Sequence, residues 1–129
     1  MMIGMQVVLT VAQMVVRVAG VLLLILGLLI WAEGMRDLVF PHTILGLVLV
    51  VALWVLAVVA ARRGTPVGLS AGVAVIGLIA LALGMAQVNL LPGPSHWIVQ
   101  ALHLLVGMAA VGSAEALGGR LRRIRLANA

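Results

Sequence analysis

The sequence predicts an all-α fold, a polytopic membrane four-helix bundle whose consecutive helices run up, down, up and down. Hydrophobic residues make up 65% of the 129 residues and charged residues only 9%, whereas soluble domains are about 45–50% apolar and about 25% charged. Between its charged breaks the chain forms four apolar segments, each near the roughly 20 residues that cross a bilayer as a helix. We therefore expect one transmembrane domain over residues 1–129.

The composition excludes several classes of function. The net charge of +5 arises from eight arginines, and the chain has no lysine. Because these arginines cluster at the edges of the apolar segments, membrane topology and lipid headgroups explain them, and we expect no nucleic acid as a partner. The chain also has no cysteine, which excludes disulfides, thiolate metal sites and covalent c-type haem attachment. Any cofactor is therefore expected to be held non-covalently.

The first predicted span covers about residues 5–31 and is longer than a bilayer requires. Gln6, Thr10, Gln13 and Arg17 follow one another at steps of three or four residues, so they share one face of a helix. We expect this polar face to look into the bundle or toward a partner. The alternative is a short amphipathic helix that lies on the membrane surface before the span.

Three further spans are expected at about residues 42–61, 67–88 and 96–117. Gly118–Gly119 resembles the end of a helix, and a basic tail is expected over residues 118–129. This tail and the turn between the second and third spans hold most of the arginines. Since cytoplasmic loops are enriched in basic residues, both termini are expected in the cytoplasm. We expect an integral protein of a bacterial inner membrane.

Two similar motifs suggest an internal repeat. His42–Leu47 reads His-Thr-Ile-Leu-Gly-Leu and His103–Met108 reads His-Leu-Leu-Val-Gly-Met, so both have two aliphatic residues, Gly, then Leu or Met after the histidine and one further residue. Each histidine precedes an arginine by 20 residues, Arg62 in one half and Arg123 in the other. The chain is therefore interpreted as a pseudo-twofold repeat of two helical hairpins.

The histidines of the two motifs are the candidate functional residues, because an ionisable or ligating side chain within a membrane span indicates function. Two imidazoles from facing helices can bind one haem iron from opposite sides, which leaves no open iron position. Gly46 and Gly107, one turn beyond each histidine, would let the haem edge approach the backbone. His42 begins its expected span, whereas His103 lies seven residues inside, so their depths differ unless the second helix starts before Pro41.

These motifs and the four-span layout resemble the membrane four-helix b-type cytochromes, in particular half of a haem A synthase and, more loosely, cytochrome b561. The resemblance implies one non-covalent haem b, with His42 and His103 as its metal ligands. The chain departs from haem A synthases because it has one bundle, one clear histidine pair and no matching outer-loop carboxylate motif. A haem A synthase is therefore not expected.

Other polar residues have several possible roles. His96 lies seven residues before His103 on the same face. It could replace His103 as a ligand, contact a haem propionate, accept a proton from a quinol, or simply face solvent. Arg36 could pair with a propionate or with a neighbouring acidic residue. Arg17 and Glu115 are expected to form an ion pair that ties the first helix to the fourth.

The preferred interpretation is a membrane electron-transfer subunit, not an enzyme by itself, that binds one haem b. Its expected partners are membrane lipid, a quinol pool, an outer-face redox protein or a second copy of the chain. One alternative is a haem-free scaffold or accessory subunit of a larger complex, whose histidines are interfacial. Another is a quinone- or lipid-binding protein without iron.

Overall fold

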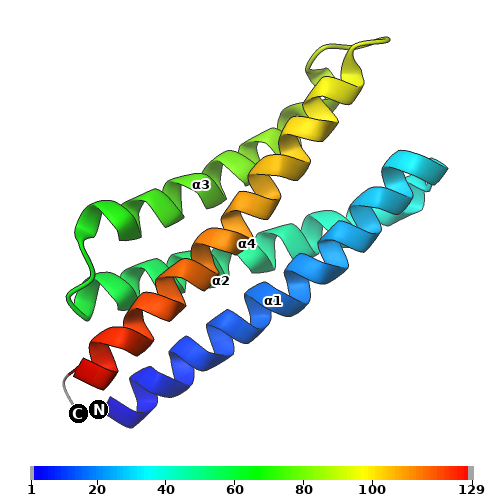
Figure 1. The fold of residues 1–129 in the computed structure, drawn as a ribbon. Helices are drawn as coiled ribbons and strands as arrows, with labels where there is room; N and C mark the ends of the chain where they lie inside the picture. The colour runs from blue at the N-terminus through cyan, green and yellow to red at the C-terminus, as the bar shows by residue number, and fades with distance from the viewer. Residues whose placement is uncertain (1, 128–129) are drawn as a thin grey trace.

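The computed structural model describes residues 2–127 and is all-helical over that range (Figure 1). Its four long helices are α1 (Met2–Glu33), α2 (Val39–Arg62), α3 (Val67–Ala86) and α4 (His96–Ala127). Two short 3₁₀ helices, η1 (Arg36–Leu38) and η2 (Gln87–Asn89), lie in the connections. All four long helices are long and apolar enough to cross a membrane. Large apolar side chains are exposed along them, as expected for surfaces that face lipid.

Each helix packs against the next one in the chain, and α1 also packs against α4. Helices α2 and α4 contact each other across the bundle as well. Figure 1 shows the start of α1, the end of α4 and the α2–α3 turn at one end of the molecule. We call this the basic end, because the turn and the end of α4 hold six of the eight arginines. The opposite end carries the loops that follow α1 and α3, and is called the loop end.

Helix α2 begins earlier than the predicted start at residue 42. It starts at Val39, directly after η1, so Pro41 falls in its first turn, where a proline is tolerated because its missing N–H has no helical acceptor to lose. His42 therefore lies inside a helix. Its depth differs less from that of His103 than a helix start at residue 42 would give.

Helix α4 does not end at Gly118–Gly119, so that prediction was wrong. The helix continues to Ala127, and only residues 128 and 129 of the expected basic tail lie outside the described residues. Gly118 is buried because the side-chain amide of Gln13 from α1 lies directly over it. The glycine thus permits close helix contact, and the arginines and leucines that follow favour a helix.

Polar contacts join the helices near the basic end. The predicted ion pair is confirmed: Arg17 Nε and Nη2 donate to Glu115 Oε1 and Oε2 over 2.6 and 2.7 Å. Arg63, at the end of α2, donates to Gln6 Oε1 on α1 over 2.8 Å. Three residues of the polar stripe, Gln6, Gln13 and Arg17, therefore contact other helices, within one unbroken 32-residue helix. Thr10 is exposed and bonds only to Gln6 of its own helix.

The buried core is confined to the half of the molecule near the basic end. Within residues 20–48 and 81–109, Val99 is the one buried residue. The core residues come from all four helices and include Val16, Leu53, Leu56, Val73, Ala110 and Leu117. The half near the loop end, which contains the histidine motifs, is therefore loosely packed. Toward this end, the α1–α2 hairpin diverges from the α3–α4 hairpin (Figure 1).

Candidate functional site

The two motif histidines meet in the loosely packed half. The ring centres of His42 on α2 and His103 on α4 are 6.2 Å apart, and the ring planes are tilted by 57°. These rings come from the two helices that contact each other across the bundle. The sequence motif therefore brings together two side chains that are 61 positions apart in the chain.

Each imidazole has a buried nitrogen without a partner. His42 Nδ1 and His103 Nδ1 are both inaccessible to solvent and form no hydrogen bond among the described residues. A buried imidazole nitrogen that lacks a hydrogen bond is unusual, because leaving it unsatisfied costs free energy. A bound metal, cofactor or water molecule would remove that cost.

A glycine supports each ring from the neighbouring helix of the same hairpin. A Cβ atom at Gly27 of α1 would lie 3.2 Å from His42 Cε1, and one at Gly84 of α3 would lie 3.0 Å from His103 Cε1. Sequence reasoning did not assign these two glycines to the site. The sequence feature that could have indicated them is that, in each half, the helix before the histidine contains a glycine.

Gly46 and Gly107, the predicted contacts for a cofactor edge, make no close contact with other helices. A Cβ atom at either position would meet no heavy atom within 4 Å. The same holds for the exposed loop glycines Gly34 and Gly93, so this openness does not by itself mark a cofactor space. Both residues lie one turn from His42 and His103 on the same helices.

The distance between the rings is within the range that a shared metal ion requires. Two imidazole nitrogens at about 2 Å from one metal place the ring centres roughly 5–6 Å apart, depending on the angle at the metal. The described residues contain no group of three or more His, Asp or Glu that could hold a metal. Two histidines alone suit a metal whose other positions are filled by a cofactor, as in haem.

Two other predicted site residues lie apart from this arrangement. His96 Nδ1 lies 3.1 Å from the backbone oxygen of Leu90, so its ring is tied to the loop before α4. Arg36 is exposed in η1 and forms no salt bridge within the described range. The prediction that it pairs with a neighbouring acidic residue is therefore not supported.

Comparisons with protein-family models, with curated proteins and with solved structures found no significant match to this chain.

Proposed function

We propose that the chain is a membrane b-type cytochrome that holds one haem b between His42 and His103. The observation that carries this proposal is the 6.2 Å separation of two imidazole rings from helices that face each other across the bundle. The unpaired Nδ1 atoms support it. Neutral imidazole is a common axial ligand of haem iron.

In this proposal, His42 and His103 would hold the cofactor, and Gly27 and Gly84 would fix the orientation of the rings. Haem supplies one-electron exchange when it is bound. An iron held by both histidines would have no open position for oxygen. The chain therefore transfers electrons between partners and catalyses no reaction alone.

The proposed orientation places the basic end in the cytoplasm, on the basis of its arginines. Both histidines then belong to the outer half of the membrane. A quinol in the membrane and a redox protein at the outer surface are the partners that this position favours. Arg36, which lies near the outer surface in this orientation, is available to a haem propionate as a charge-assisted hydrogen-bond donor.

Contacts in the structure support the proposed duplication in addition to the sequence similarity of the two motifs. In α1–α2, a glycine of the first helix contacts a histidine of the second, and the same relation holds in α3–α4. A duplicated hairpin of this kind would produce a bundle with an approximate twofold axis along the membrane normal.

One different function has an observation in its favour. The loose packing between residues 20–48 and 81–109 also suits a haem-free accessory subunit, in which a partner protein completes the core. The same histidines would then lie at a protein interface. Haem binding separates the two proposals.

The decisive test is a haem titration of the purified protein in mild detergent. We expect one haem per chain and a reduced spectrum with the sharp α band of a low-spin b haem. The double variant His42→Ala/His103→Ala should remain colourless, whereas the control variant His96→Ala should titrate as the wild type does. If the wild type stays colourless, or if the double variant binds haem equally well, the cytochrome proposal is wrong.

A second prediction concerns the glycine behind His103. Gly84→Leu should displace the imidazole, since even a Cβ atom would lie 3.0 Å from Cε1. Overpacking typically costs about 1–3 kcal/mol, so we expect haem affinity to fall roughly tenfold to a hundredfold. Gly72→Leu is the matched control, because it adds the same side chain to α3 at a position with open space. Equal haem affinity in both variants would show that Gly84 does not position the ligand.

A further inference from the structure

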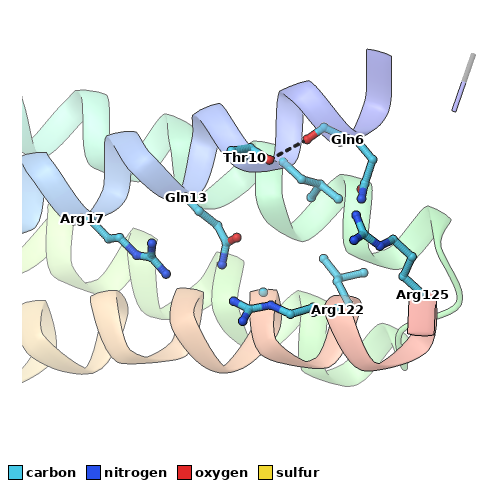
Figure 2. A pocket seen from close by; sticks show the side chains of 9 residues that line it. Gln6, Thr10, Gln13, Arg17, Arg122 and Arg125 are labelled. Atoms are coloured by element: carbon cyan, nitrogen blue, oxygen red, sulfur yellow. Dashed lines mark hydrogen bonds between the residues drawn. The ribbon is translucent and has the colours of Figure 1, made fainter. Parts of the chain in front are cut away.

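A polar cavity lies between α1 and α4 at the basic end. His42 and His103 lie toward the loop end of the molecule. Its volume is about 280 Å³. Figure 2 shows side chains from both helices directed into the space between them. The lining residues are Gln6, Leu9, Thr10, Gln13, Arg17, Gly118, Leu121, Arg122 and Arg125.

The lining is cationic and still has free donors. It contains three arginines and no acidic residue. Glu115 binds only Arg17. Within the described range, Gln13, Arg122 and Arg125 form no side-chain hydrogen bond. Two guanidinium groups and one amide are therefore available to an anion in the cavity.

An open apolar space adjoins the cavity. It is a shallow surface of α1 alone, and its residues are Arg17, Val18, Val21 and Leu22. Arg17 borders both spaces. The apolar residues continue along α1 from Arg17, near the middle of the predicted span, toward the loop end. An occupant that fits both spaces has an anionic end at the basic end and an apolar chain that runs into the bilayer.

We propose that these two spaces bind one anionic phospholipid of the adjacent leaflet. Arg122, Arg125 and the Gln13 amide hold its phosphate, and an acyl chain lies against Val18, Val21 and Leu22. Basic pockets between membrane helices are suited to anionic headgroups, and arginine is the side chain best matched to phosphate. The site is separate from the histidines, so it does not depend on haem binding.

Gly118 keeps the headgroup space open. The Gln13 amide lies directly over this glycine, so a side chain at position 118 would force the amide out toward the cavity. A small residue on α4 thus determines how deep the polar space reaches between the helices.

The experiment is native mass spectrometry of the detergent-solubilised protein with phosphatidylglycerol, phosphatidylcholine or inorganic phosphate. We expect phosphatidylglycerol to bind and phosphatidylcholine and phosphate alone not to bind. In Arg122→Gln/Arg125→Gln, phosphatidylglycerol affinity should fall roughly tenfold to thirtyfold, at about 1 kcal/mol for each basic residue. Arg120→Gln/Arg123→Gln removes the same charge from the same helix outside the cavity, and should bind as the wild type does.

A second variant protects the test against a folding defect. Gln13→Glu places a carboxylate beside the expected phosphate and should weaken phosphatidylglycerol binding, while the elution volume and helix content stay unchanged. Equal losses in the two double variants would show that only net charge matters and would overturn the proposal. Equal binding of phosphatidylcholine would exclude selection for an anion, and binding of inorganic phosphate alone would exclude a lipid site.

Discussion

Replacing His103 by alanine should convert the low-spin haem spectrum to a high-spin one and weaken haem binding. In the proposed site, His42 and His103 hold the iron together, and their ring centres lie 6.2 Å apart, so removal of either would leave one iron ligand. We expect haem affinity to fall by about a hundredfold or more, since loss of an outer-shell partner alone can cost 10–100-fold. Haem titration followed by absorbance and electron paramagnetic resonance measures both changes.

Free imidazole, which replaces the deleted side chain, provides a direct control for this result. Imidazole added to His103→Ala should enter the vacated space and restore the low-spin spectrum, because it supplies the same ligand atom. His42→Ala should behave in the same way, since each histidine has a glycine of the preceding helix against its ring. A low-spin spectrum in His103→Ala without added imidazole would mean that another residue is the ligand, and His96→Ala in that background would identify it.

Glu115→Ala should destabilise the folded protein more than any neutral surface substitution on α4. Its carboxylate accepts two hydrogen bonds from Arg17, and without it the guanidinium must reach water from within a span. The two side chains are 52% and 40% exposed, so they are only partly enclosed by protein. Interhelical polar contacts in membranes are typically worth about 0.6 kcal/mol and at most about 1.7 kcal/mol. We expect a loss within that range.

A double-mutant cycle isolates this contact. Arg17→Gln, Glu115→Gln and the combined variant should be compared by reversible unfolding in mixed micelles. The double variant should lose less stability than the sum of the two single variants. Arg120→Gln, also on α4 but outside the ion pair, should leave the free energy of unfolding unchanged. If the single losses simply add, the ion pair does not contribute.

The sequence predicted the features that depend on composition and spacing. Four apolar segments became four long helices, and the three- and four-residue steps of the α1 polar stripe placed Arg17 opposite Glu115. The repeated motif brought His42 and His103 together. Helix periodicity places the polar residues of one helix on one face, and the cost of leaving a polar group in lipid turns that face toward another helix, even one far away in the sequence.

The features that the sequence did not predict depend on which helix lies opposite. Gly118 looked like a helix end, because nothing local shows that Gln13 lies over it. The contacts of Gly27 and Gly84 with the histidines were not predicted, because a glycine carries no signal for the side chain that contacts it. The start of α2 at Val39 was also missed, since Pro41 is compatible with several positions in a first turn.

The uneven core of the bundle has a consequence for how such a protein can change over time. Most of the contacts that stabilise the helices lie near the basic end, while the histidine pair lies where Val99 is the one buried residue within residues 20–48 and 81–109. Except at Gly27 and Gly84, which contact the rings, substitutions in that half therefore cost little folding free energy. The same four helices can accept new residues, and new cofactor surroundings, at one end while the other end preserves the fold.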